Sequence, residues 1–232
     1  MRKLLVSDFD NTLLNNDDFL KNIKIINEFV KQGNIFVIAT GRHINSLLNL
    51  IKTYDIKYSY LINNDGGIIF DHNLNIIYQK NIPKKTAQKI IEIFQNSNCL
   101  IDWYVDTGLG ITKDVNNNVN GLIGRFNNLK EAEVLFKNIV TLHNDIHGYL
   151  TLKHINITEK TVTKGNAIKI LNKKLNLKED NIYTIGDTIN DISMSIFNSY
   201  CMTNSLPDLK KICKGEYQSV YNFVKDILNN KI

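Results

Sequence analysis

The chain has 232 residues, of which 43% are hydrophobic and 22% are charged, with 12 glycines and 2 prolines. This composition is typical of a globular protein with one large domain, or of one domain that carries an insertion. The net charge of +5 comes from scattered lysines without a block of like charges, so the sequence does not indicate a nucleic-acid-binding surface.

The cysteines and the apolar segments bear on the location of the protein. Cys99, Cys201 and Cys213 are far apart and form no C-x-x-C pair, which favours free thiols in a reducing compartment. The apolar run that ends at Val6 is too short for a secretory signal peptide. No stretch approaches the ~20 apolar residues of a membrane span. We therefore expect a cytoplasmic protein that binds neither a membrane nor nucleic acid.

The first part of the chain alternates apolar strands with amphipathic helices. The expected elements are, in order, a strand at 4–6, a helix at 18–31, a strand at 34–39, a helix around 47–51 and a strand at 58–62. Each strand is followed by polar residues, and the strand at 34–39 is apolar almost throughout, as in a parallel strand that is buried on both faces. The pattern predicts a Rossmann-like, doubly wound α/β sheet, which binds ligands at the carboxyl ends of its strands.

A pair of acidic residues follows the first expected strand. Asp8 and Asp10 are two residues apart, so both carboxylates can point to the same side of an extended chain. Two such close charges are sensible if a divalent cation binds there, or if one carboxyl group holds a proton for acid–base chemistry. A solvated Asp-Asn turn is the alternative interpretation of the same residues.

The pattern changes in the middle of the chain. After a hairpin at 68–78, we expect a helix at 83–96, strands at 100–105 and 110–115, a polar loop at 116–121, a helix at 129–142, and strands at 149–152 and 155–157. Such a series of strand pairs and helices inside an α/β chain predicts an inserted small α/β cap domain. We place the cap domain at residues 82–158, and the core domain at 1–81 and 159–232.

The strand–helix alternation then resumes. We expect a helix at 166–175 with Lys164 at its start, a strand at 181–185, and short strands at 199–202 and 218–220. Lys164 would gain stability from an anion bound at the same helix end, although a surface lysine is the commoner case. Asp187 and Asp191 form a second acidic pair after a buried strand.

Four short motifs in this order resemble those of the haloacid dehalogenase (HAD) superfamily, in its Cof-like branch of small-molecule phosphatases. The motifs are Asp8-Phe9-Asp10-Asn11-Thr12, Thr40-Gly41-Arg42, Lys164-Gly165, and Gly186-Asp187-Thr188-Ile189-Asn190-Asp191. The insertion falls between the second and third motifs, as in this branch. The chain departs from its relatives at Asn64-Asp65-Gly66-Gly67, where they usually carry Asn-Gly-Ala.

The resemblance implies a role for each motif residue in the hydrolysis of a small phosphorylated metabolite. Asp8 would be the nucleophile that forms an aspartyl-phosphate, and Asp10 would be the general acid and base. Mg²⁺ would be held by Asp8, by the backbone carbonyl of Asp10 and by Asp187, with Asp191 as a ligand or as a neighbour of the ligands.

The remaining implied roles concern the phosphate and the leaving group. Thr40, Gly41 and Lys164 would hold the phosphoryl oxygens, and Asn190 would orient Lys164 or the phosphate. Arg42 and Arg125 are candidates for substrate contacts.

Two other functions remain open at this point. A phosphomutase that resembles phosphomannomutase would share the core motifs, but it needs cap cations for a second phosphate, and Arg125 is the one arginine in the expected cap. A phosphate-ligand sensor without catalysis would not need a general acid. Hydrolysis of an aryl phosphate, and its dependence on a bisphosphate activator, would separate these functions.

Overall fold

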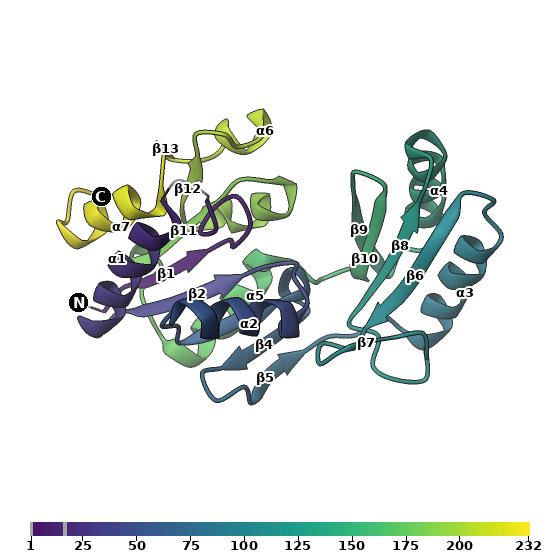
Figure 1. Cartoon of the computed structure of the whole chain (residues 1–232), viewed down its shortest axis with the longest axis horizontal. Helices are drawn as coiled ribbons and strands as arrows, with labels where there is room; N and C mark the ends of the chain where they lie inside the picture. Colours follow the sequence, from purple (N-terminus) through teal and green to yellow (C-terminus); the bar gives the residue numbers. More distant parts are fainter. Residues whose placement is uncertain (1, 16–17) are drawn as a thin grey trace.

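A computed structural model describes residues 2–15 and 18–232 of the chain, and these form two α/β units (Figure 1). One unit is built on a sheet of eight strands and the other on a sheet of five. The larger sheet takes its strands from both ends of the chain, whereas the smaller sheet takes its strands from the middle (Figure 1). The larger unit is called the core here, and the smaller unit is called the cap.

The core sheet is mostly parallel, with strand β1 near its centre. In sheet order its strands are β13 (Glu216–Tyr217), β12 (Asn198–Met202), β11 (Ile182–Gly186), β1 (Leu4–Ser7), β2 (Ile35–Ala39), β3 (Tyr60–Asn63), β4 (Ile68–Asp71) and β5 (Ile76–Gln79). The strands from β13 to β3 pair in parallel, and β4 and β5 extend the sheet as an antiparallel hairpin. The order of connection reverses at β1, because β2 lies on one side of it and β11 on the other.

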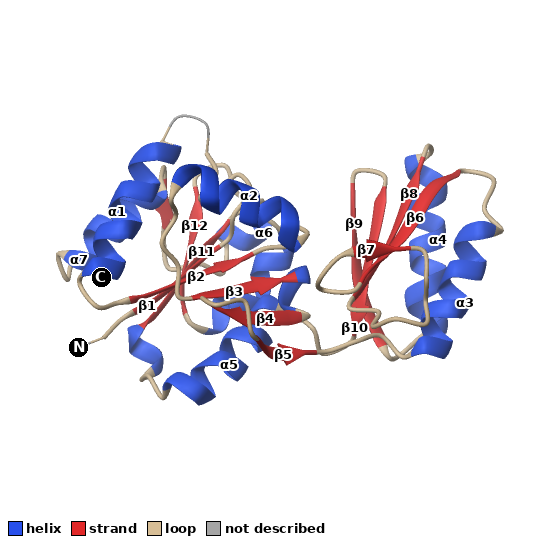
Figure 2. Cartoon of the chain, turned by 60° about the horizontal axis from the view of Figure 1, so that its bottom comes forward, coloured by secondary structure: helices blue, strands red, loops and turns tan. Residues whose placement is uncertain are grey.

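Helices cover both faces of the core sheet, so its central strands are apolar on both sides. The helices are α1 (Phe19–Lys31), α2 (Ile44–Tyr54), α5 (Lys164–Leu175), α6 (Pro207–Lys210) and α7 (Val220–Leu228), with short 3₁₀ segments at Asn64–Gly66, Glu179–Asn181 and Ile189–Ile196. Figure 2 shows α1 and α2 on one side of the sheet and α5 on the other. Leu5 points toward α1, whereas its neighbours Leu4 and Val6 pack on the α5 side.

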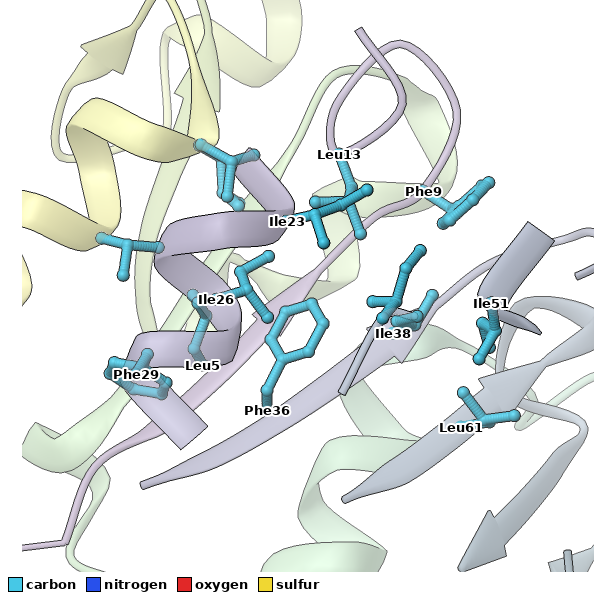
Figure 3. Close-up of a cluster of buried hydrophobic side chains, with 14 of the residues drawn as sticks. Leu5, Phe9, Leu13, Ile23, Ile26, Phe29, Phe36, Ile38, Ile51 and Leu61 are labelled. Carbon is cyan, nitrogen blue, oxygen red and sulfur yellow. The ribbon is translucent and has the colours of Figure 1, made fainter. Parts of the chain in front are cut away.

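The side chains between the sheet and α1 form a continuous apolar cluster (Figure 3). Phe36 of β2 lies beside Ile26 of α1 in this cluster, which also includes Phe29 of α1, and all three side chains are fully buried. Phe9 and Leu13 belong to the same cluster, so the loop after β1 is anchored by its apolar residues while its acidic residues remain at the sheet edge. A fully buried Phe or Leu side chain contributes about 1.5–3 kcal/mol.

One strand near the carboxyl end of the chain was predicted wrongly. We expected a strand at 218–220, but the strand β13 is Glu216–Tyr217 and Val220 begins α7. The side chain of Ser219 accepts a hydrogen bond from the backbone N–H of Asn222, which is the geometry of a helix N-cap. The apolar side chains that follow recur at helical spacing and pack against α1 and the sheet.

The cap is an antiparallel sheet with two helices on one face. Its strands are, in sheet order, β7 (Ile111–Thr112), β6 (Leu100–Asp106), β8 (Gly121–Phe126), β10 (His154–Glu159) and β9 (Ile146–Thr151). Helices α3 (Lys84–Gln95) and α4 (Leu129–Leu142) lie on the side of this sheet away from the core (Figure 2). The opposite face of the cap sheet is therefore free to line a space between the two units.

Strand β8 occupies the centre of the cap sheet, although the sequence did not predict it. Its glycines interrupt the alternating pattern that marks a strand. A Cβ atom on Gly124 would lie 2.8 Å from the ring of Phe94 and 2.9 Å from that of Phe126. The two rings pack edge to face with their centroids 5.5 Å apart, so the residue at 124 must be small for α3 to reach the sheet.

The predicted fold class is confirmed, because a parallel α/β core carries an inserted α/β cap. The domain division at 82–158 stays a prediction; the two chain crossings between the sheets fall after β5 and after β10. Within residues 2–15 and 18–232, every helix is too short or too polar to cross a bilayer.

Candidate active site

The carboxyl ends of the parallel core strands bring the predicted site residues to one edge of the sheet. Asp8 follows β1, Thr40 follows β2 and Asp187 follows β11. Asp65 lies in the short turn after β3, and Lys164 begins α5. The connection order reverses at β1, which is the place where doubly wound sheets bind ligands.

Lys164 lies at the centre of this edge, between two carboxylates. Its Nζ atom is 2.6 Å from Oδ1 of Asp8 and 2.6 Å from Oδ1 of Asp191, and its side chain is fully buried. Burial by itself lowers the pKa of Lys164, but the charges of Asp191 and Asp8 outweigh burial and raise that pKa above its usual value. Lys164 is therefore a fixed positive charge rather than a proton donor.

Three buried carboxylates share this one ammonium group. Oxygen atoms of Asp8, Asp187 and Asp191 all lie within 4.8 Å of one another. Burial raises the pKa of Asp8 well above its usual value, and the charges of Asp191 and Asp187 act in the same direction against the effect of Lys164. Burial and the charge of Asp191 raise the pKa of Asp187 to about 6. The cluster therefore holds more negative charge than Lys164 offsets.

The donor set of this cluster fits a divalent cation with a preference for oxygen ligands, such as Mg²⁺. The hydroxyl group of Thr12 donates a hydrogen bond of 2.9 Å to Asp187 and orients that carboxylate. Asp191 is differently placed: its Oδ1 accepts from Lys164, while its Oδ2 accepts from the backbone N–H groups of Asp187 and Thr188 at 2.9 and 3.0 Å. Asp191 thus shapes the loop and holds Lys164, which leaves Asp8 and Asp187 as the better placed carboxylate ligands.

Asp10 lies outside the acidic cluster and pairs with Arg42. Two nitrogens of the Arg42 guanidinium donate to the two oxygens of Asp10 at 2.6 and 2.7 Å. The Asp10 side chain is 43% exposed and that of Arg42 is 30% exposed. The Arg42 guanidinium also lies over the ring of Phe9, 5.4 Å from its centroid. This pair holds the Asp10 carboxylate at the solvent side of the site, where a leaving group would enter and leave.

A cleft of about 410 Å³ extends from these residues to the cap. Its core wall includes Asp8, Asp10, Thr40, Gly41 and Asn190. The residues that the cap contributes to its lining share one property, which is that none is an acid, a lysine or an arginine: Tyr104, Ile123, Tyr149, Thr151, His154 and Asn156. The cleft thus has a charged wall and an uncharged wall.

The structure does not bring all the candidate substrate residues together. Arg42 lines the cleft, whereas Arg125 is exposed and is absent from the lining residues. Arg125 lies in β8 two residues beyond Ile123, opposite His154 in the neighbouring strand, so it is on the correct face of the cap sheet but beyond the cleft.

Asn190 has partners other than those expected. Its amide nitrogen donates to Asp65 at 2.8 Å, and its amide oxygen accepts from the hydroxyl group of Thr188 at 2.5 Å. Lys164 is held instead by Asp8 and Asp191. The role of Asn190 toward the phosphate stays a prediction.

Some cleft residues were missed by the sequence analysis. Tyr104 lines the cleft, whereas its neighbour Trp103 packs against the cap core, as expected for adjacent residues of a strand. His154 and Asn156 carried a similar signal, because they alternate with the buried Ile155 and Ile157. Tyr149 carried no such signal, since its position depends on how the cap lies on the core.

Comparison with known proteins identifies the family of the chain. The family model described as haloacid dehalogenase-like hydrolase matches residues 5–149 and 111–222. The chain belongs to this family.

The HAD-like relatives cover the chain along its length. A protein of Buchnera aphidicola subsp. Baizongia pistaciae named "Putative phosphatase" is 27% identical in an alignment of 269 residues, gaps included, that covers 100% of each chain. The 5-amino-6-(5-phospho-D-ribitylamino)uracil phosphatase YcsE of Bacillus subtilis is 26% identical over 210 residues, covering 83% of this chain and 79% of YcsE. The chain is therefore an HAD-type phosphatase, as its motifs predicted.

Solved structures show the same fold at lower sequence identity. A structure from Plasmodium vivax, titled as a "putative HAD/COF-like hydrolase", superposes with a TM-score of 0.85 at 20% identity and covers 99% of this chain and 96% of that one. The structure of an HAD subclass IIB sugar phosphatase superposes with a TM-score of 0.79 at 17% identity and covers 99% of both chains. The predicted membership of the HAD superfamily is confirmed by the family model, and the solved structures show that the fold is shared over the whole chain.

Proposed function

We propose that this HAD-like protein is a Mg²⁺-dependent phosphatase of the cytoplasm that hydrolyses a small phosphomonoester with an uncharged leaving group, through an aspartyl-phosphate on Asp8. The observation that carries the proposal is the buried contact of Lys164 with Asp8, a residue that lines the cleft. A phosphatase of this type needs a carboxylate nucleophile and a fixed positive charge beside the phosphoryl group. The pair supplies both in one place.

The proposed first step transfers the phosphoryl group to Asp8. Asp10 enters this step protonated, with its contact to Arg42 reduced to one oxygen. An oxygen of the Asp8 carboxylate attacks phosphorus, the bond from phosphorus to the leaving oxygen breaks, and Asp10 gives that oxygen its proton. Lys164 keeps its proton throughout and lies beside the phosphoryl oxygens, where Thr40 and the Gly41 backbone add hydrogen bonds. Arg42 orients the carboxylate of Asp10 from its exposed side.

The proposed second step regenerates the enzyme. Water attacks phosphorus while Asp10 accepts a proton from it, the bond between phosphorus and Asp8 breaks, and inorganic phosphate leaves. Asp10 thus acts as an acid and then as a base, and both carboxylates return to their starting states. Its exposed position suits this exchange, because both the leaving group and the water arrive from the cleft.

The carboxylates of Asp8 and Asp187 and the backbone carbonyl of Asp10 would hold Mg²⁺, with Asp191 as the residue that fixes their loop. When bound, the ion would offset the negative charge of the carboxylates and of the phosphoryl oxygens. The excess of buried negative charge around Lys164 supports this proposed metal site. Removing one partner of a buried ion pair costs about 3–5 kcal/mol, so each of these charges depends on the others.

The cap wall supports the proposed class of leaving group. Tyr104 and Ile123 offer apolar surface, and Thr151, His154 and Asn156 offer hydrogen-bonding groups. A second phosphate or a carboxylate on the leaving group would meet no cap arginine or lysine among the described residues that line the cleft. The phosphomutase alternative needs such a cation, and the position of Arg125 outside the cleft does not favour it.

Hydrolysis of para-nitrophenyl phosphate tests this proposal. We expect phosphate release with Mg²⁺, no release with EDTA, and recovery when excess Mg²⁺ is returned. Asp8→Asn protein is the control for contaminating phosphatases. Phosphate binding without release by the wild-type protein would instead support the sensor, and activity only with an added sugar bisphosphate would support the mutase.

A further inference from the structure

Asp65 is a buried acidic residue that the proposed reaction does not use. It lies between the core and the cap, in the turn after β3, and is 9% exposed. Its backbone is left-handed, with φ of 55° and ψ of 23°, a conformation that glycine and asparagine adopt more readily than most residues. A buried carboxylate in such a turn requires a reason, because its desolvation is costly unless hydrogen bonds compensate it.

The carboxylate of Asp65 joins the cap to the core. Its Oδ2 accepts a hydrogen bond of 2.7 Å from the hydroxyl group of Tyr149, which belongs to cap strand β9. Its Oδ1 accepts a hydrogen bond of 2.8 Å from the amide nitrogen of Asn190, which belongs to the core loop after β11. Burial and the charge of Asp65 raise the pKa of Tyr149, so the tyrosine stays protonated and remains a donor.

This chain of hydrogen bonds passes beside the predicted phosphate-binding residues. A Cβ atom on Gly41 would lie 3.0 and 3.3 Å from the Asp65 oxygens and 3.3 Å from the Tyr149 hydroxyl oxygen. Gly41 follows Thr40, whose backbone carbonyl accepts from the N–H of Asp65 at 3.2 Å. A shift of Asp65 would therefore displace the amide group of Asn190 and change the packing against the Thr40–Gly41 segment.

A second set of contacts between the two units is made by Asn120. Asn120, just before β8, bonds to the side chain of Asn64 and to the carbonyls of Gly67 and Lys80. Those bonds join the cap to both ends of the turn that contains Asp65 and to the segment after β5, but they do not reach the Asp65 carboxylate. The bond of Tyr149 to Asp65, by contrast, reaches a residue that also bonds a predicted phosphate-binding side chain.

We propose that Asp65 is a positioning residue that makes phosphate affinity depend on the cap, because the Tyr149 hydroxyl fixes Asp65 and Asp65 fixes the amide of Asn190. This inference rests on the proposed function. Its consequence is that a hydroxyl group of the cap acts on the binding of inorganic phosphate, even though the phosphate is held by core residues.

The test is a double-mutant cycle read by calorimetric titration of the protein with inorganic phosphate in the presence of Mg²⁺. We expect Tyr149→Phe to weaken phosphate binding about 3–10-fold, which is the range for the loss of one hydrogen bond. Asp65→Gly should weaken it by at least as much, and glycine suits the positive φ, so this variant should fold. Adding Tyr149→Phe to Asp65→Gly should then have no further effect.

Two further variants separate positioning from general damage. Asp65→Asn can still accept from Asn190 with its amide oxygen while its amide nitrogen donates to the Tyr149 oxygen, so we expect phosphate affinity within about twofold of wild type. Tyr183→Phe is the matched control, because it removes a tyrosine hydroxyl that bonds the carbonyl of Ile232 at 3.3 Å. This control should leave phosphate affinity unchanged.

Several results would overturn the inference. One is that the effects of Asp65→Gly and Tyr149→Phe on phosphate affinity are additive. Another is that Asp65→Gly binds phosphate more tightly than wild type, or that Asp65→Asn binds it much more weakly. The last is that the wild type does not bind phosphate. The aryl phosphate assay with Mg²⁺ reports separately on the proposed function. Normal turnover together with an additive cycle would contradict the role of Asp65 alone, whereas absent turnover would contradict the phosphatase.

Discussion

The two walls of the cleft differ in how their polar groups are held. On the core side, Lys164 is buried and contacts Asp8 and Asp191 at 2.6 Å, Thr12 donates to the buried Asp187 at 2.9 Å, and the Asp10–Arg42 pair is partly exposed. On the cap wall, the lining groups are hydroxyl, amide, imidazole and apolar side chains on one face of a sheet, and none of them is an acid, a lysine or an arginine. The core wall therefore suits one reaction on the phosphoryl group, and the cap wall suits contacts with the rest of the substrate.

The difference also concerns what each wall tolerates. A buried charge on the core wall loses several kcal/mol of stabilisation when its partner is removed, so the core residues depend on one another. An exposed cap residue such as Thr151 changes at little cost to the fold, because surface substitutions usually stay within about 0.5 kcal/mol. Changes on the core wall should abolish the reaction, and changes on the cap wall should alter which substrate is used.

The largest effect is expected for Asp8→Asn. The amide keeps the shape of the side chain and its oxygen can still accept from Lys164, but it cannot attack phosphorus, so turnover should fall about 10⁴-fold or more. Steady-state hydrolysis of para-nitrophenyl phosphate measures the loss. The variant should remain folded, because Asp191 still pairs with Lys164 and the amide oxygen at position 8 can still accept from it. Substantial turnover by the verified variant would contradict the role of Asp8.

A smaller effect is expected for Asp10→Asn, and it should depend on the leaving group. General acid catalysis contributes about 10²–10⁴-fold, and an alkyl alcohol needs the proton far more than nitrophenol does. Comparing kcat for an alkyl phosphate with kcat for an aryl phosphate measures this difference. Ser46→Ala is a control, because Ser46 accepts from Arg42 at 3.2 Å without contacting the carboxylate. Equal losses on both substrates would argue against Asp10 as the acid.

The cap wall can be tested with two substrates that differ in charge. Glucose 6-phosphate and 6-phosphogluconate carry the phosphate at the same end, and the second has a carboxylate at the other end. We expect kcat/KM to favour the uncharged leaving group about 10–100-fold, because a buried carboxylate without a partner is costly. Thr151→Lys should reduce the ratio of kcat/KM for glucose 6-phosphate to kcat/KM for 6-phosphogluconate, because it places a cation on the cap wall. If the wild type instead prefers 6-phosphogluconate, the cap wall does not select an uncharged leaving group.

The smallest expected effect is on stability, and it comes from Asp187. Its pKa is about 6 in the folded protein and about 3.9 when unfolded, so the folded state binds more protons between these values. In EDTA, the free energy of unfolding should therefore fall as the pH rises from about 4 to 6, by roughly 1–2 kcal/mol from this residue. Urea unfolding at several pH values measures the change.

Two comparisons sharpen the stability measurement. Asp187→Asn should flatten the pH dependence, whereas Asp55→Asn, the same change at an exposed residue, should leave it as in wild type. Mg²⁺ should raise the unfolding midpoint of the wild type near pH 7 and have little effect on Asp187→Asn. A wild-type midpoint that ignores millimolar Mg²⁺ would contradict a preformed metal site.

The sequence was most informative where local pattern and burial agree. The strand β2 was predicted because its residues are apolar on both faces, and the acids at 8 and 187 were placed correctly because they directly follow buried strands. Strand β8 was missed because Gly124 interrupts the alternation of apolar and polar side chains that marks a strand. Position 124 must be glycine because a Cβ atom there would clash with the ring of Phe94. The local sequence therefore concealed the central strand of the cap.

The contacts that join the two units could not be predicted in this way. Asp65 meets Tyr149 and Asn190, which are 84 and 125 residues away along the chain. Arg125 shares a sheet face with cleft residues, yet it lies beyond the cleft because the core covers only part of that face. Both outcomes depend on the position of the cap over the core, and no local pattern encodes that position.

The most direct test of the account is to capture the phosphoryl group on Asp8. Asp10→Asn protein should accumulate the aspartyl-phosphate during turnover of an aryl phosphate with Mg²⁺, because it lacks the base for the second step while the first step scarcely needs an acid. Acid quenching followed by peptide mass spectrometry would locate the modification. The account predicts phosphate on the peptide that contains Asp8, absent when Asp8→Asn is added. Turnover without any phosphorylated peptide, or with the phosphate on another residue, would contradict it.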